Sequence, residues 1–305
     1  MSDPESFDLV IPRYMESRHN GNALAAIGDR PANPRAHKKA FIRAVLDFGP
    51  VQSAIDLGKS SATYRRVLNS WLPAWLRYRG VYSSFEEAVD NAPKSLRVGC
   101  DYDDVAQTFE RQGFLQSDYP AVFWLREALK DGASVFDLGG SVGISFYNWE
   151  RYVSYPEGIR WTVCELPAAV RIGEQLARER HESRLRFTTR VEEADGYHCL
   201  LASGSLQYID ASLADSLARL GSQPKHLLIN RLPLHGQREC VTLQNIRWLA
   251  SPYRVFHRDT FVQGLKSLGY EVVDSWTVPD HDCWIPFYPE FSVDSFSGLY
   301  LRKST

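Results

Sequence analysis

The chain has 305 residues, of which 44% are hydrophobic and 24% are charged, as is typical of folded globular proteins. Its 35 basic and 37 acidic side chains leave a formal net charge of −2, which argues against a nucleic-acid partner, because such binding depends on lysines and arginines facing phosphates. No apolar run approaches the roughly 20 residues of a membrane span, and the acidic N-terminus lacks a signal-peptide core. Five widely spaced cysteines predict a cytoplasmic protein with no disulfide framework and no metal site.

The first third of the chain is predicted to be an arm followed by a cap. Residues 1–38 are polar and show no sustained period, which predicts a loose arm. A helical period follows over residues 39–78, and another helix is expected from Asp118-Tyr119-Pro120, with Asp118 or Tyr119 at the N-cap. We therefore expect residues 39–130 to form a mainly helical cap, and a domain boundary near residues 130–134.

From Ser134 onward, segments typical of strands and helices alternate, which predicts an α/β domain over residues 131–305 with a mainly parallel sheet. The expected strands are Ser134–Leu138, Arg160–Cys164, Leu185–Thr188, Tyr197–Ala202, Lys225–Asn230, Tyr270–Thr277 and Gly298–Arg302. The expected helices lie near Val142–Arg151, Pro167–Arg180, Ala211–Leu220 and Arg258–Leu268. Only an irregular segment joins the last two strands, so we expect them to pair antiparallel at the sheet edge.

A glycine turn follows the first of these strands, in Asp137-Leu138-Gly139-Gly140-Ser141-Val142-Gly143. Glycines permit a tight turn and close approach of a ligand, and the helix that follows presents free N–H groups, although a turn used only for packing is the alternative. The spacing differs from the G-x-G-x-x-G of dinucleotide-binding proteins. Asp137 would also repel a pyrophosphate about 4 Å away by about 1–4 kcal/mol, whereas it would attract a sulfonium or ammonium group.

A second acid closes the next strand, in Cys164-Glu165-Leu166-Pro167. Glu165 follows Asp137 by 165 − 137 = 28 residues, the length of one strand-helix-strand unit. A carboxylate there can accept hydrogen bonds from both hydroxyls of a ribose. The alternative is a solvated acid that caps the helix beginning at Pro167.

These two motifs resemble those of class I S-adenosylmethionine-dependent methyltransferases. A narrower resemblance, to a group of bacterial methyltransferases whose acceptors are not established, extends over most of the chain from Tyr78. The segments that carry it are Gly80-Val81-Tyr82-Ser83-Ser84-Phe85-Glu86-Glu87-Ala88, Asp118-Tyr119-Pro120, Ser203-Gly204-Ser205-Leu206-Gln207-Tyr208, Gln244-Asn245-Ile246 and Gly269-Tyr270-Glu271. The resemblance implies a Rossmann-like sheet of seven strands with the last strand reversed.

The resemblance also implies methyl transfer from S-adenosylmethionine to an oxygen or nitrogen of a small molecule, with S-adenosylhomocysteine as the product. The residues expected to hold the cofactor are Asp137, Gly139, Gly140, Ser141, Gly143, Glu165, Leu166, Ser203 and Gly204. Ser141 stands where the family pattern has a glycine, and its hydroxyl is a candidate partner for the methionine carboxylate. A non-catalytic relative that binds the adenosyl ligand, or binds none, and an NAD-dependent oxidoreductase remain as alternatives.

The sequence does not single out a catalytic base. Related O-methyltransferases carry a histidine after the fourth strand, where this chain has Ser203–Tyr208. The candidates are Tyr208, Arg231 and His235, which follow the fourth and fifth strands and are expected at the carboxyl edge of the sheet. Each has a purely structural alternative. His198 is expected in the core, and His257 is expected to begin a helix.

Overall fold

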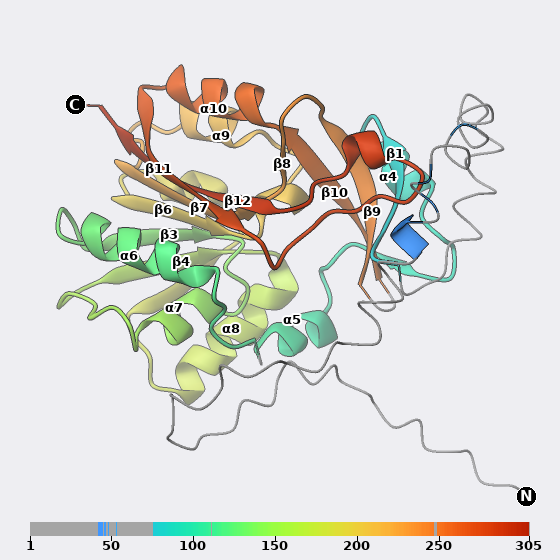
Figure 1. The fold of residues 1–305 in the computed structure, drawn as a ribbon. Helices are drawn as coiled ribbons and strands as arrows, with labels where there is room; N and C mark the ends of the chain where they lie inside the picture. Colours follow the sequence, from blue (N-terminus) through green and yellow to red (C-terminus); the bar gives the residue numbers. More distant parts are fainter. Residues whose placement is uncertain are drawn as a thin grey trace, which may run out of the picture.

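The computed structural model describes residues 76–110, 112–246 and 249–304, together with residues 42–44, 46, 48 and 53. The predicted arm, residues 1–38, and most of the predicted helical segment 39–78 lie outside these residues. Two β-sheets make up the described part, a large one with helices on both faces and a smaller one beside it (Figure 1). In this part of the chain, no helix is long and apolar enough to cross a membrane.

The large sheet has seven strands in the order β11-β12-β7-β6-β3-β4-β5. Its strands are β3 (Ser134–Leu138), β4 (Arg160–Cys164), β5 (Leu185–Thr188), β6 (Cys199–Ser203), β7 (His226–Leu232), β11 (Tyr270–Val278) and β12 (Phe296–Lys303). All neighbours pair in parallel except β12, which is antiparallel to both β7 and β11. The predicted Rossmann-like sheet with its last strand reversed is therefore confirmed. The strand order reverses between β3 and β6, the point where open α/β sheets bind ligands.

Helices cover both faces of this sheet, as Figure 1 shows. On one side lie α6 (Asp118–Ala128), α7 (Ile144–Trp149) and α8 (Pro167–Glu179), and on the other α9 (Leu213–Ala218) and α10 (Arg258–Lys266). Successive residues of β6 show why: Cys199 and Leu201 enter one core cluster, and Leu200 and Ala202 enter the other. A strand buried on both faces reads as a continuous apolar run, which is why these strands were predictable.

The smaller sheet was not predicted. It consists of β1 (Tyr78–Tyr82), β9 (Cys240–Ile246), β10 (Leu249–His257) and β2 (Arg97–Val98), and β8 (Leu234–His235) pairs with β10. The antiparallel pair β9–β10 is inserted between β7 and α10, and β1 pairs antiparallel with β9. Short helices α4 (Phe85–Asp90) and α5 (Asp103–Glu110) follow β1 and β2, and the single-turn 3₁₀ helices are η1 (Val191–Ala194), η2 (Leu206–Tyr208) and η3 (Pro289–Phe291).

An aromatic segment of the connection between β11 and β12 forms the core of this smaller sheet. Trp284, Ile285 and Phe287 are buried in one cluster with Tyr78 of β1 and Tyr253 of β10. The segment therefore packs against the smaller sheet.

The smaller sheet lies at the carboxyl edge of the large one. Tyr208 of η2, just after β6, contacts Tyr253 of β10 edge to face at 5.1 Å between ring centroids. At another point, the main-chain N–H of Gly99 donates to the Ala250 carbonyl of β10, and Asp101 accepts from the N–H of Ala168 in the first turn of α8. The smaller sheet and its flanking segments therefore bridge the ends of β4 and β6.

Candidate functional site

The glycine turn between β3 and α7 is fixed by a left-handed backbone and close contacts. Gly139, Ser141 and Gly143 have φ angles of 75°, 53° and 89°, a region that non-glycine residues enter rarely. The N–H of Gly139 donates to the Cys164 carbonyl at 2.8 Å. A Cβ on Gly139 would lie 2.2 Å from the Cβ of Ser205, so only glycine fits there. Ser141 therefore adopts a backbone conformation that is strained for serine and would be unstrained for glycine.

Asp137 lies directly beneath this turn. A Cβ on Gly140 would lie 2.4 Å from the carboxyl carbon of Asp137, so the missing side chain of Gly140 makes room for the acid. The Asp137 side chain has no solvent exposure, and its Oδ2 accepts from Trp161 Nε1 at 3.2 Å. Its Oδ1 has no hydrogen-bond partner among the described residues. Burial raises the pKa of Asp137 to about 7, although the Trp161 bond opposes this.

Glu165 connects the end of β4 to the glycine turn. Its Oε1 accepts from the Ser141 N–H at 3.2 Å, and its Oε2 accepts from the Leu166 N–H at 2.7 Å. Burial raises the pKa of Glu165, and the two backbone hydrogen bonds act in the opposite direction. The alternative in which Glu165 is a solvated acid capping α8 is wrong, because Glu165 is only partly exposed and Asp101 caps that helix, accepting from Ala168 N–H at 2.8 Å.

A buried ion pair supports the ends of β6 and β7. Arg231 Nη1 lies 3.0 Å from Asp118 Oδ1, and their side chains are 11% and 6% exposed. Arg231 Nη2 also donates to Ser203 Oγ at 2.9 Å, and Asn230 Nδ2 donates to the same hydroxyl at 3.2 Å. Asp118 does not cap its own helix, for which Ser117 is the N-cap residue. Instead its Oδ2 accepts from the Leu115 N–H at 3.0 Å.

Arg231 is held in a strained conformation next to Gly204. Its φ is 57°, and that of Gly204 is 77°, while a Cβ on Gly204 would lie 3.2 Å from Arg231 Nε. Non-glycine residues in this region cost about 1–3 kcal/mol and are concentrated at functional sites. The Gly204 N–H donates to the Asn230 carbonyl at 2.8 Å. The structure thus gives Arg231 a positioning role around Ser203 and Gly204 and engages its guanidinium in an ion pair.

The other two base candidates, Tyr208 and His235, also make internal hydrogen bonds through the Tyr208 hydroxyl and through Nδ1 of His235. Tyr208 donates its hydroxyl to Gln244 Oε1 at 2.6 Å, and burial raises its pKa well above the usual range of tyrosine. His235 Nδ1 accepts from the N–H groups of Gln237 and Arg238 at 3.0 and 2.9 Å, which caps the turn between β8 and β9. Burial lowers the pKa of His235. The predicted role of His257 is confirmed, because it is the N-cap of α10 and accepts from the Thr260 N–H.

The structure places the predicted cofactor residues at one edge of the sheet. Register pairs Leu138 with Cys164 and Ser203 with Asn230, so the glycine turn, Glu165 and Leu166, and Ser203 and Gly204 all follow the carboxyl ends of neighbouring strands. Leu166 is 44% exposed beside Glu165. The residues that sequence analysis missed are Asp101, Trp161 and, as an ion-pair partner, Asp118. Only Asp118 carried a signal, since it begins one of the segments of resemblance.

No protein-family model matches the chain, and no curated protein matches it. Solved structures do resemble it. The Burkholderia thailandensis 1,6-didemethyltoxoflavin-N1-methyltransferase is 22% identical over 62% of this chain and 79% of that one, with a TM-score of 0.44. Magnesium protoporphyrin IX methyltransferase from Synechocystis PCC 6803 is 14% identical over 65% of this chain and 84% of that one, with a TM-score of 0.42. The [4+2]-cyclase SpnF is 14% identical over 70% of this chain and 100% of that one, with a TM-score of 0.41. One fold can serve many chemistries, so function has to be inferred from this chain's own residues.

Proposed function

We propose that this protein binds S-adenosylmethionine at the carboxyl edge of its large sheet and transfers the methyl group to an oxygen or nitrogen of a small molecule. The observation that carries the proposal is the pair of acids at the glycine turn. Asp137 is fully buried under Gly140 with one oxygen unpaired, and Glu165 bonds the N–H of Ser141 in the same turn.

The chemistry of this pair fits a cationic adenosyl ligand and opposes a dinucleotide. A buried carboxylate favours a positive charge nearby, and its unpaired oxygen is stabilised by one. A pyrophosphate over the same turn would meet two acids, and each of them repels it when ionised. Asp137 and Glu165 therefore favour S-adenosylmethionine over NAD, the cofactor of the alternative oxidoreductase.

The chain's own residues divide the work of holding this ligand. Glu165 accepts from the ribose hydroxyls, and Gly139, Gly140 and Gly143 give the ligand close access to the backbone. Ser203 and Gly204, fixed by Arg231, face the methionine part of the ligand. When bound, S-adenosylmethionine supplies a methyl group already activated on a sulfonium.

The engagement of Tyr208, Arg231 and His235 favours a mechanism without a dedicated base. Tyr208 holds its hydroxyl and His235 holds Nδ1 in internal hydrogen bonds, and Arg231 is in a buried ion pair. The protein's contribution is then to align an acceptor that is nucleophilic on its own, and orientation of this kind can lower a barrier by several kcal/mol. We propose that the smaller sheet and the segments that flank it choose the acceptor, because their contacts through Asp101 and Tyr253 lie at the ends of β4 and β6.

Calorimetric titration with S-adenosylhomocysteine, S-adenosylmethionine and NAD tests the proposal. The parent should bind both adenosyl compounds and give no heat with NAD. Glu165→Ala should weaken S-adenosylhomocysteine binding about tenfold to more than a hundredfold, since a hydrogen bond to a charged group contributes about 1.5–3 kcal/mol.

The matched control is Glu174→Ala, which removes an exposed acid of α8 that is 3.8 Å from Arg178. This variant should bind like the parent. Binding of NAD in place of the adenosyl compounds, or full affinity in Glu165→Ala, would contradict the placement of the ligand. Formation of S-adenosylhomocysteine during incubation with S-adenosylmethionine and candidate acceptors then separates an enzyme from a non-catalytic relative.

A further inference from the structure

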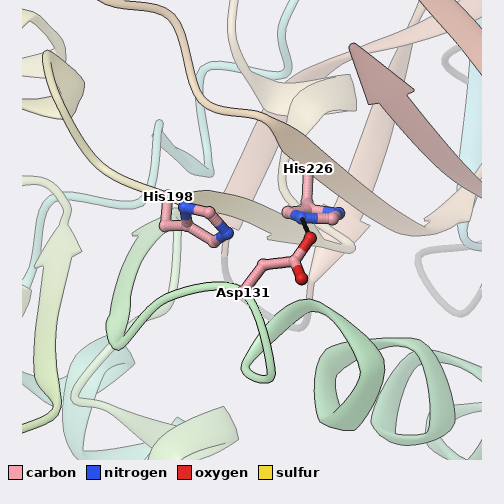
Figure 2. Close-up of side chains that lie close together, drawn as sticks. All are labelled: Asp131, His198 and His226. Carbon is pink, nitrogen blue, oxygen red and sulfur yellow. Dashed lines mark ion pairs between the residues drawn. The ribbon is translucent and has the colours of Figure 1, made fainter. Parts of the chain in front are cut away.

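Two histidines and an aspartate meet at the opposite edge of the large sheet from the glycine turn. Asp131 follows α6, His198 immediately precedes β6, and His226 is the first residue of β7. One potential ligand atom from each residue lies within 4.8 Å of those of the other two. Figure 2 shows the two imidazole rings and the carboxylate turned toward one another.

Both imidazoles carry a buried ring nitrogen without a good hydrogen-bond partner. Nε2 of His198 makes no hydrogen bond to any residue of the described chain, and Nε2 of His226 has only a long ion-pair contact of 3.4 Å with Asp131 Oδ2 in the same part of the chain. His226 is only 2% exposed, so water has little access to it. An unpaired buried polar atom is costly, and a metal ion at this position would satisfy both nitrogens together.

The contacts around His226 prepare it as a metal ligand. Its Nδ1 lies 2.7 Å from the Tyr300 hydroxyl, and Trp124 stacks on the Tyr300 ring at 4.4 Å between centroids. When Nδ1 donates to the hydroxyl oxygen, Nε2 presents its lone pair, and metal-binding histidines are usually oriented by such a partner.

The Asp131 carboxylate already lies at the distance from His226 that two ligands of one metal ion have from each other. Asp131 Oδ2 lies 3.4 Å from His226 Nε2, and two ligands about 2 Å from one tetrahedral ion are about 3.3 Å apart. The His198 ring is pressed against the backbone of Gly132, where a Cβ would lie 2.6 Å from its Cγ. Asp131 is exposed, which leaves a path for an ion to enter and a side open to water.

We propose that Asp131, His198 and His226 bind a zinc ion, with water in the fourth position. Two imidazoles and one carboxylate are a donor set that zinc uses in proteins. The site ties the end of α6 to the starts of β6 and β7, and it would stabilise the fold through binding to the folded state only. These ligands are far apart in the sequence, so no spacing motif could predict this site.

Lys225 gives the proposal a test of opposite sign. Its Nζ lies 2.8 Å from Asp131 Oδ2 and is partly exposed. A lysine there competes with a cation for the carboxylate, so removing it should strengthen zinc binding. If the ion pair with Asp131 were purely structural, removing Lys225 would leave zinc affinity unchanged or would destabilise the fold.

The experiment uses the full chain without an affinity tag, treated with a chelator and then titrated calorimetrically with zinc. The parent should bind one zinc ion, its melting temperature should rise with zinc, and cobalt in its place should give the visible absorption bands of a four-coordinate ion. His198→Gln and Asp131→Asn should each weaken zinc binding at least about tenfold, and Tyr300→Phe about tenfold to a hundredfold. Lys225→Met should bind more tightly than the parent.

His281→Gln is the control, because His281 is also paired with an aspartate, Asp280, at 3.1 Å, but no second histidine lies beside it among the residues that the structure describes. It should bind zinc like the parent. The proposal would be overturned if the parent bound zinc no more tightly than the His198→Gln variant does. It would also be overturned if His281→Gln lost as much zinc affinity as His198→Gln. These readouts do not depend on methyl transfer, so a failure here leaves the function proposed above untouched.

Discussion

Replacing Asp137 by asparagine should remove a large pH dependence from the stability of this protein. Burial raises the pKa of Asp137 from its ordinary value of 3.8 to about 7. An acid whose pKa is higher in the folded state binds more protons when folded, so its favourable contribution is full below about pH 4 and is lost as the pH rises to about 7. Between about pH 5 and about pH 8 this loss amounts to about 2.5 kcal/mol.

Urea denaturation of the parent and D137N across this pH range measures the effect. The free energy of unfolding of the parent should fall by about 2–3 kcal/mol relative to that of the variant as the pH rises. The prediction concerns how the free energy of unfolding changes with pH and not its absolute value, because the asparagine amide brings new N–H groups into a site without water. Glu165 and Arg231 also act on Asp137 electrostatically, and both are present in parent and variant, so the difference isolates Asp137.

Trp161→Phe provides a second variant with a distinct outcome. Trp161 Nε1 donates to Asp137 Oδ2 and thereby lowers its pKa. Without this donor the pKa of Asp137 should rise further, and the pH at which stability levels off should move upward. Parallel stability curves for the parent and D137N would refute the reasoning, since they would mean that Asp137 keeps its ordinary pKa when buried.

Two more substitutions test the geometry of the site. Ser141→Gly should raise the free energy of unfolding by up to about 1 kcal/mol, because glycine adopts the 53° φ angle without steric cost; urea denaturation measures this, and a less stable variant would contradict the strain. Asp118→Ala should cost about 3–5 kcal/mol in the same assay, because it leaves Arg231 as an unpaired buried charge. Its control, Asp210→Ala, removes an exposed partner of Arg254 and should cost within about 1 kcal/mol; equal losses would refute the importance of the buried pair.

The sequence alone determined the large sheet and the position of its ligand edge. Strands such as β6 and β7 are buried on both faces, so their apolar runs are continuous and easily distinguished from the amphipathic helices. Once the strands are parallel, their carboxyl ends share one edge. For this reason the sequence alone predicts that Asp137, Glu165 and Ser203 lie near one another.

Only the tertiary structure revealed the smaller sheet and the contacts that fix the site. Strand β9 buries the polar residues Thr242, Gln244 and Asn245, which bond to a distant part of the chain; Asn245 Nδ2, for example, donates to the Leu76 carbonyl at 3.0 Å. Polar residues satisfied in this way give no hydrophobic period, so β9 does not read as a strand. The Asp118–Arg231 pair likewise joins residues that local patterns cannot connect, because periodicity reports which face of an element is buried and not which partner buries it.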